Sequence, residues 1–573
     1  MNYMLCDKKL RLLISSLIAA CFMASVYFLC GIWFETSDDV AISEMLAGKI
    51  TGSSEFHCPY VRTFISWPIS LLYGLSDSIP WWGLFIFIVL FLVVAINLYY
   101  LLVFSKSIWE HILIVIAVMA VFVAGIHVFG QAQYTSATIM LATTGYVALC
   151  VAFLRKEKPN YVLFVLLELI ACGVRDSSMI LIQPIGLLSL LGVLMYRENA
   201  SKGYREAFKQ MAIIICAIGM ILIVSKVDEA ITFRDDSWKE YYKFNEVQAY
   251  LTDYERKIPY EELESIFDKY QVSKEDYYQT LEYRTWYGED KLSKECIDEL
   301  LPALKEMRSL EYKADVVFVA FKQLLFSSRE FWGLHRLTAL VFIIVFAVTF
   351  IVGKSKVIIP LTMTFMGYIV GLTFLALRNR FVLRVMMPYY ISTLLFLVIL
   401  GIVVLGELNK GKAVKSVFAI LAVSLAVAAL SIGKIQFSYV RAQNRHVNTI
   451  GFQEGKEIME YCINHPENKY VLDISYQKSV CTDIFETGYY KRANHVYSGS
   501  WYSMMPTIKA YSKEYLKDEF CFAVYEAAEY KGMDGAEYFA DNRGIGTELK
   551  DESKLSSGAT LLVYEIGKSN VAR

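Results

Sequence analysis

Two adjacent carboxylic acids, Asp38 and Asp39, occupy the position in this chain that best suits acid–base chemistry. They follow the first long apolar run, and Thr36 or Ser37 can cap a helix that begins at this pair. A carboxylate fixed there could act as general base for an acceptor hydroxyl, or the two acids could hold a divalent cation such as Mg²⁺ or Mn²⁺. The alternative is structural, because acids also stabilise helix N-termini.

Arginines in the short polar segments form a second pattern. A guanidinium group presents a planar fork of donors that suits phosphate oxygens, so a cluster of arginines would bind the phosphate or diphosphate of a lipid. Alternatively, the side chains reach toward a membrane surface or form local ion pairs, for example Arg175 with Asp176. The candidate phosphate ligands are Arg62, Arg175, Arg378, Arg380 and Arg384.

The composition indicates an integral membrane protein. Of the 573 residues, 56% are hydrophobic and 20% are charged, whereas soluble proteins have roughly 45–50% and about 25%. This balance excludes a soluble enzyme and a disordered chain, and 11 cysteines are too few for a disulfide scaffold. A net charge of −1 provides no basic face for nucleic acid.

The apolar residues gather in runs that predict about eleven membrane-spanning helices. A span needs roughly 20 apolar residues, and the fifth run is short enough to be a re-entrant or broken helix, so we expect ten to twelve spans. The runs are 10–34, 81–104, 108–129, 136–154, 161–172, 179–196, 211–227, 337–352, 357–377, 387–405 and 414–432.

The distribution of basic residues predicts that the N-terminus is cytoplasmic. Lys8, Lys9 and Arg11 precede an uncleaved first span, and with this start the short inside segments carry most of the loop Lys and Arg. The polar regions 35–80, 228–335 and 433–573 then lie outside a bacterial cell membrane. No large inside segment and no GxxxxGK[ST] or GxGxxG motif is present, so a cytoplasmic ATPase or kinase domain is not expected.

We therefore expect a polytopic α-helical membrane protein with two extracytoplasmic additions. Residues 1–227 form a transmembrane module whose first outer loop is 35–80, and 336–432 form a second module. Residues 228–335 predict a Tyr-rich helical insertion. Residues 433–573 predict a small α/β domain, with a helix at 452–464 and strands at 470–474, 520–525 and 560–566.

Two short segments carry a resemblance to a known superfamily. TSDDVAI at 36–42, directly after the first span, precedes a surface helix, and RFVLRVMMP at 380–388 enters a late span. With many spans between them and an extracytoplasmic tail after them, these segments resemble the GT-C superfamily of polytopic glycosyltransferases, which use polyprenyl-phosphate sugars. A Trp-Trp-Asp motif is absent, because neither Trp81-Trp82 nor Trp501-Tyr502 is followed by Asp, which argues against N-linked oligosaccharide transfer.

The resemblance implies a function and roles for the candidate residues. Asp38 or Asp39 would be the catalytic acid–base or metal residue, and the outer arginines would hold the lipid phosphate. The partners would be a polyprenyl-phosphate sugar, membrane lipid, and an extracytoplasmic glycan, wall polymer or lipid as acceptor. Because consecutive residues on a helix lie about 100° apart, only one acid can face a given cavity, and we favour Asp38.

Three other functions stay open. A lipid-linked glycan polymerase or ligase also uses outer arginines, but such proteins usually lack an acidic pair after the first span. A flippase or transporter should carry charged residues within its spans, where Glu168 is the main exception to an otherwise apolar pattern. The third alternative is a protein that binds glycans without turning them over.

Overall fold

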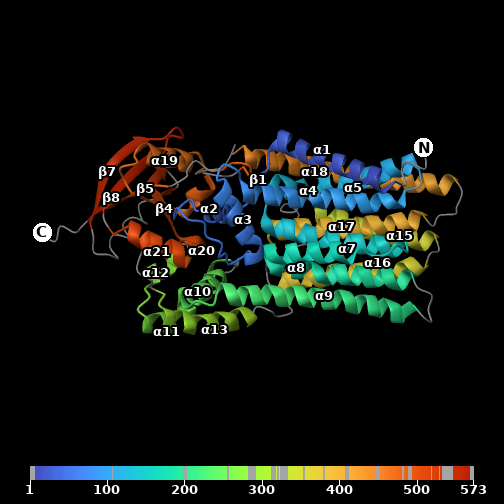
Figure 1. Cartoon of the computed structure of the whole chain (residues 1–573), viewed down its shortest axis with the longest axis horizontal. Helices are drawn as coiled ribbons and strands as arrows, with labels where there is room; N and C mark the ends of the chain where they lie inside the picture. The colour runs from blue at the N-terminus through green and yellow to red at the C-terminus, as the bar shows by residue number, and fades with distance from the viewer. Residues whose placement is uncertain are drawn as a thin grey trace.

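In the computed structural model, a bundle of long helices is continued at one end by a layer of shorter helices and strands (Figure 1). The structure describes residues 7–105, 107–197, 203–253, 257–281, 292–310, 318, 322, 333–352, 355–377, 381–406, 412–445, 452–479, 483–487, 493–517, 519–527, 530–531 and 546–567. Arg378 and Arg380 lie outside these ranges.

Within the described ranges, nine helices are long and apolar enough to cross a membrane. They are α1 (Lys8–Cys30), α4 (Trp81–Leu101), α7 (Tyr134–Leu154), α8 (Tyr161–Arg197), α9 (Gly203–Thr232), α15 (Leu334–Val352), α16 (Ile358–Leu377), α17 (Leu383–Gly406) and α18 (Lys412–Asn444). A polytopic helical architecture is thus confirmed. The count of eleven stays a prediction, because α5 (Ile108–Ala124) has only 17 residues and α8 contains both the fifth and the sixth predicted run.

The helix α8 reverses direction at Arg175. Its 37 residues include one with non-helical backbone angles, Arg175 at φ −163° and ψ 99°. Gln183 Nε2 donates a hydrogen bond of 3.2 Å to Glu168 Oε2, although 15 residues of straight helix would separate the two by roughly 22 Å. The segments before and after Arg175 are therefore two arms that lie side by side.

All three large polar regions lie at one end of the bundle, opposite the start of α1 (Figure 1). The first contributes α2 (Ser37–Ala47) and α3 (Thr63–Leu75), and the insertion contributes α10 (Asp236–Thr252), α11 (Glu264–Lys269), α12 (Lys274–Leu281) and α13 (Lys294–Leu310). The C-terminal region adds α19 (Phe452–Asn464), α20 (Ser500–Ser503) and α21 (Pro506–Tyr515). We call this end the polar end; which side of the membrane it faces stays a prediction.

The C-terminal region contains a mixed sheet of the order β4-β3-β5-β8-β7, in which β6 (Tyr530–Lys531) also pairs with β5. The strands β4 (His495–Ser498), β3 (Tyr470–Asp473) and β5 (Phe520–Ala527) run parallel, and β8 (Thr560–Gly567) and β7 (Gly546–Lys554) follow antiparallel. The predicted helix and three strands are confirmed, and β4, β6 and β7 were missed. The charged, exposed sequence of β7 suits an edge strand. That this region is a separate domain stays a prediction.

Backbone pairing joins the polar end to the bundle. The strand β1 (Trp33–Phe34) runs parallel to β2 (Gln131–Ala132), which directly precedes α7. Ile484 N donates to Ile32 O over 3.1 Å. At the end of α18, Asn444 Nδ2 lies 3.0–3.2 Å from the carbonyl oxygens of Cys30, Gly31 and Gly130. These bonds fix where α1 ends, and hence where Asp38 lies.

Gly83→Ala is expected to destabilise this junction. A Cβ added at Gly83 on α4 would lie 1.7 Å from the carbonyl oxygen of Ile484, so backbone must move. We expect a loss of about 1–3 kcal/mol of stability, measured as a lower thermal midpoint of the purified protein. Gly219→Ala on α9 is the matched control, because its Cβ meets no atom within 4 Å. Equal midpoints for the two variants would contradict the close approach.

Candidate functional site

The helix α2 positions the acidic pair. Thr36 is its N-cap residue with extended backbone angles, and Gly48 ends it in the left-handed conformation at φ 69°. Asp38 and Asp39 lie in the first turn, so the predicted start of the helix is confirmed. The Thr36 side chain makes no capping hydrogen bond, however. The carboxylates are thus placed where N–H groups of the first turn are free and the helix dipole favours negative charge.

The two acids point to different parts of the protein. Asp38 Oδ1 accepts a hydrogen bond of 2.9 Å from Trp501 Nε1 of the C-terminal region. Asp39 Oδ1 accepts one of 3.2 Å from Trp82 Nε1 on α4. The pair therefore does not share one ligand, and the described ranges contain no group of three or more His, Cys, Asp or Glu that could hold a metal ion. The cation site predicted at Asp38 and Asp39 would need further ligands, such as phosphate oxygens.

Burial distinguishes the two acids. Asp39 is 0% exposed, and among the described residues its Oδ2 has no hydrogen-bond partner. Burial, and then the neighbouring Asp38 charge, raise the pKa of Asp39 well above its usual value, although hydrogen bonds from Trp82 and from the backbone of Tyr134 lower it. Asp38 is only half-buried. Of the two, Asp38 is the more accessible candidate for a general base.

Arg175 lies at the reversal of α8 within a cage of aromatic rings. Its guanidinium donates to the hydroxyl of Tyr134 and lies over the rings of Tyr134 and Tyr60, 4.9 and 5.3 Å from their centroids. It is close enough to Asp38 for the two charges to interact. Among the described residues it forms no ion pair within 4.0 Å, and one bond to Tyr134 uses only one of its five N–H donors.

Arg384, in the first turn of α17, is a second cation near Tyr134. Ser136 Oγ donates a hydrogen bond of 2.8 Å to the carbonyl oxygen of Arg384, which connects the starts of α7 and α17. The charge of Arg384 acts on Tyr134, as the charge of Arg175 does. In the part of the chain that the structure covers, the guanidinium of Arg384 has neither a hydrogen bond nor an ion pair. The structure thus brings together Asp38, Arg175 and Arg384.

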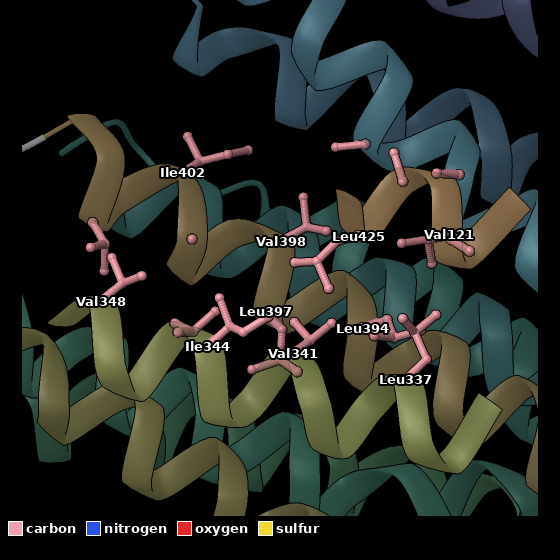
Figure 2. A pocket seen from close by; sticks show the side chains of 17 residues that line it. Val121, Leu337, Val341, Ile344, Val348, Leu394, Leu397, Val398, Ile402 and Leu425 are labelled. Atoms are coloured by element: carbon pink, nitrogen blue, oxygen red, sulfur yellow. The ribbon is translucent and has the colours of Figure 1, made fainter. Parts of the chain in front are cut away.

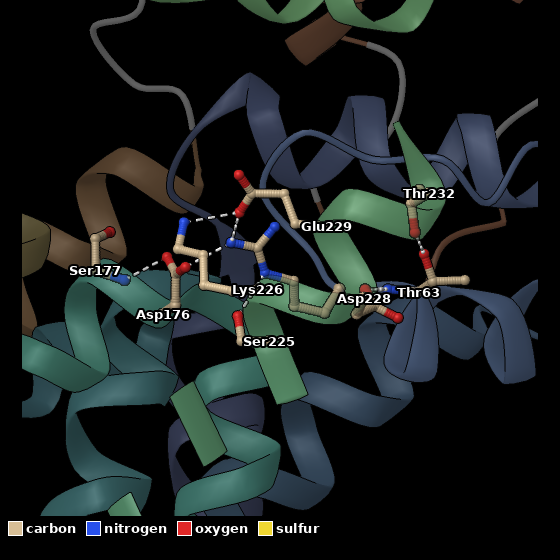
Figure 3. A network of polar contacts seen from close by, with 9 residues as sticks. Thr63, Asp176, Ser177, Ser225, Lys226, Asp228, Glu229 and Thr232 are labelled. Atoms are coloured by element: carbon tan, nitrogen blue, oxygen red, sulfur yellow. Dashed lines mark hydrogen bonds and ion pairs between the residues drawn. The ribbon is translucent and has the colours of Figure 1, made fainter. Parts of the chain in front are cut away.

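Arg62 has different surroundings. Its guanidinium lies 2.5 Å from Asp176 Oδ2, 2.6 Å from Glu229 Oε2 and 2.8 Å from Ser225 Oγ (Figure 3). Asp176 therefore pairs with Arg62, not with Arg175 as the local alternative suggested. Two carboxylates already neutralise Arg62, so nothing in this geometry favours a phosphate contact there.

Several residues of the site carried no signal in the sequence. Trp501 lies 463 positions from Asp38 in the sequence. Tyr241 belongs to the insertion, and its Oη donates a hydrogen bond of 3.1 Å to the Trp501 carbonyl oxygen. Tyr60 and Tyr134 are two of 39 tyrosines. The position of Tyr134 just before an apolar run could have distinguished it, but nothing distinguished Tyr60, because pairing of side chains so far apart leaves no periodic pattern.

Comparisons with protein-family models, with curated proteins and with solved structures found no match to this chain. The function is therefore argued from the site itself: a half-buried carboxylate, two arginines without carboxylate partners, and aromatic side chains, at one end of helices that can cross a membrane. The GT-C resemblance stays a prediction.

A buried carboxyl on α2 also joins it to the C-terminal region. Glu44 is 7% exposed, and its Oε2 accepts a hydrogen bond of 2.6 Å from Gln477 Nε2. Burial raises the pKa of Glu44 from 4.5 to about 7, and the bond from Gln477 lowers it only in part. This contact keeps the α2 helix, and so Asp38, against the segment that leads to Trp501.

Glu44→Gln is expected to remove a pH dependence of stability. The unfolded carboxyl loses its proton near pH 4.5 and the folded one near pH 7, so wild-type stability falls as pH rises between these values and is constant above. The variant should be about 3 kcal/mol more stable than wild type above pH 7, and equal to it at pH 4. Thermal midpoints across this range test it, with the exposed Glu460→Gln on α19 as control. Parallel curves of thermal midpoint against pH for wild type and Glu44→Gln would contradict the raised pKa of Glu44.

Proposed function

We propose that this protein transfers a sugar from a polyprenyl-phosphate donor to the hydroxyl of an extracytoplasmic acceptor. The observation that supports it best is the contrast in pairing. Arg62 is neutralised by carboxylates, whereas among the described residues Arg175 and Arg384 form no ion pair, and the charges of both act on Tyr134, as the charge of Asp38 does. Guanidinium groups held without a counter-ion near a membrane boundary suit a phosphate group.

Each group has a defined role in the transfer. The bond between the anomeric carbon and the donor phosphate breaks, and the phosphate oxygen leaves with the electron pair. Arg175 and Arg384 stabilise the charge that grows on this oxygen in the transition state. Asp38 takes the proton of the acceptor hydroxyl as the new glycosidic bond forms. Direct displacement inverts the anomeric centre.

The aromatic residues prepare these groups for reaction. Trp501 Nε1 orients the Asp38 carboxylate by binding Oδ1, which leaves Oδ2 for an acceptor hydroxyl. Tyr134 and Tyr60 fix the plane of the Arg175 guanidinium. Groups held in place in this way lose little energy to reorganisation during the reaction.

An apolar cavity further along α17 suits the chain of the donor lipid. It has a volume of about 180 Å³ and is lined only by aliphatic residues and one glycine, from α5, α15, α17 and α18 (Figure 2). Its lining runs along α15 from Leu337 to Val348, roughly 16 Å of helix. Arg384 lies in the first turn of α17, and the same helix contributes Leu394 and Val398 to the cavity. Under this proposal α17 carries both an arginine that binds the phosphate and part of the site for the isoprenoid chain of the lipid.

One observation favours a second candidate, a flippase or transporter of lipid-linked glycans. Glu168, in the first arm of α8, is 0% exposed, and its Oε1 has no hydrogen-bond partner among the described residues. A carboxyl inside a membrane bundle often serves transport. The two functions differ in their dependence on Asp38 and Glu168, because only transfer needs a base at the polar end.

Asp38→Asn is expected to lower turnover about 10²- to 10⁴-fold while donor binding is retained, because the amide cannot accept the acceptor proton. Asp39→Asn should stay within about tenfold of wild type, since the Asp39 side chain is fully buried and not open to an acceptor hydroxyl. The measurement uses purified protein in lipid, radiolabelled polyprenyl-phosphate sugars, and release of polyprenyl phosphate. Arg384→Ala is expected to weaken donor binding.

The same assay separates the candidates. Transfer that survives Asp38→Asn, together with glycan movement across vesicles that is lost in Glu168→Gln, would establish the transporter instead. Equal activity of wild type, Asp38→Asn and Asp39→Asn would leave the acidic pair with its structural role alone.

Gly401→Leu is expected to discriminate between donor lipids by chain length. A Cβ at this cavity position meets no described atom within 4 Å, so we expect the larger side chain to occupy part of the cavity. Affinity for a long-chain polyprenyl phosphate should fall on the order of tenfold, as buried CH₂ contacts are lost, and affinity for a short-chain isoprenyl phosphate should not. Gly219→Leu, also without contacts and away from the cavity, is the control. Equal losses for both lipids would contradict this assignment.

A further inference from the structure

The turn that presents Arg175 is supported from outside its own helix. Where α8 reverses, carbonyl groups of the first arm lose the N–H donors that a continuing helix would supply. One of them, Gly173 O, accepts a hydrogen bond of 2.7 Å from Arg62 N. The segment before Arg175 is thereby held by the backbone at the start of α3.

The Arg62 side chain holds the residue that follows Arg175. Its guanidinium, only 6% exposed, lies 2.5 Å from Asp176 Oδ2, and it also binds Ser225 and Glu229 of α9 (Figure 3). One residue therefore binds both sides of Arg175, through its backbone to Gly173 and through its side chain to Asp176. Charge-assisted contacts from two nitrogens of one guanidinium fix geometry as well as charge.

The packing leaves the turn little room to move. A Cβ at Gly173 would lie 2.4 Å from the ring of Phe64 and 2.6 Å from Ile65, both on α3. The backbone N–H of Thr63, the residue after Arg62, donates a hydrogen bond of 2.8 Å to Asp228 Oδ2 of α9. Arg62 thus stands at the point where α3, the turn of α8 and the end of α9 meet.

Electrostatics give Arg62 a second effect. Asp176 directly follows Arg175 in the sequence and is a carboxylate that could pair with it, whereas Asp38 and Asp253 act on Arg175 without forming an ion pair within 4.0 Å. Arg62 pairs with Asp176, and Lys226 shares Glu229 at 3.0 Å, so two cations balance two acids. Among the described residues, Arg175 is thus left without a carboxylate in an ion pair.

From these contacts we infer that Arg62 is a positioning residue: it holds the Gly173–Asp176 turn and occupies Asp176, so that Arg175 stays available for an anionic ligand. This inference rests on the proposed function, in which Arg175 binds the donor phosphate. It also gives Arg62 a different role from direct phosphate binding.

The test combines two readouts on full-length protein in lipid nanodiscs. Hydrogen exchange of residues 172–178 is measured without ligand, and affinity is measured for polyprenyl phosphate. Arg62→Ala should speed exchange at the turn and weaken affinity on the order of tenfold to a hundredfold, as expected for a displaced ligand group. Arg62→Lys keeps one charge but loses the fork, and should lie in between. Arg62→Lys also provides both readouts if Arg62→Ala fails to fold.

A second substitution separates positioning from general damage. In Arg62→Ala the free Asp176 can pair with Arg175, so adding Asp176→Asn should restore part of the affinity. Asp176→Asn alone keeps an amide oxygen that can accept from Arg62 and frees no carboxylate for Arg175, so it should lose less affinity than Arg62→Ala. Lys243→Ala removes an exposed ion pair with Asp298 and is the control for surface charge.

The outcomes are distinct. Unchanged exchange and unchanged affinity in Arg62→Ala and Arg62→Lys, with affinity lost in Arg175→Ala, would overturn the inference. An affinity loss in Arg62→Ala that Asp176→Asn does not relieve, with unchanged exchange at the turn, would overturn it as well. If Arg175→Ala binds polyprenyl phosphate as wild type does, the proposed function fails, while the exchange data still decide whether Arg62 holds the turn.

Discussion

The reversal of α8 at Arg175 determines how the candidate site is built. A straight helix of 37 residues would carry Arg175 in mid-course, among apolar neighbours. The reversal moves it to the polar end and turns its guanidinium toward Tyr134 and Tyr60. The cost of breaking the helix is offset by hydrogen bonds from outside α8, of which the bond from Arg62 N to Gly173 O is one. The site therefore depends on α3 and α9 although neither helix supplies a reacting group.

The acid of the site depends in a similar way on distant segments. Asn444 at the end of α18 and the β1–β2 pair fix the exit of α1, and α2 begins four residues after β1 starts at Trp33. Trp501 then reaches Asp38 from the far end of the chain. Because the C-terminal region bonds both to Asp38 and, through Gln477, to Glu44, it forms one wall of the site. A membrane bundle alone would leave the carboxylate without its orienting donor.

The sequence predicted local features well and long-range pairing poorly. Apolar periodicity and length predicted the long helices and three short strands. The cap before the acidic pair predicted the helix that begins there. The charged strand β7 was missed, since an exposed edge has no apolar pattern. All five arginines looked alike, because position between apolar runs says nothing about the acids that fold against them. Glu229, which pairs with Arg62, lies at the end of a different predicted span.

Whether an arginine pairs with a carboxylate thus says more about its role than its position in the sequence does. Desolvating a guanidinium is costly, and a fold compensates for it with carboxylates, as at Arg62, or with neutral oxygens and aromatic rings, as at Arg175. The first arrangement satisfies the charge within the protein. The second leaves part of the positive potential unbalanced, which in the proposed function would serve the donor phosphate. The charge of Arg384, on α17, also acts on Tyr134. In the proposed transfer, these two guanidinium groups and the carboxylate of Asp38 would create a field that aligns a phosphate leaving group and an acceptor hydroxyl.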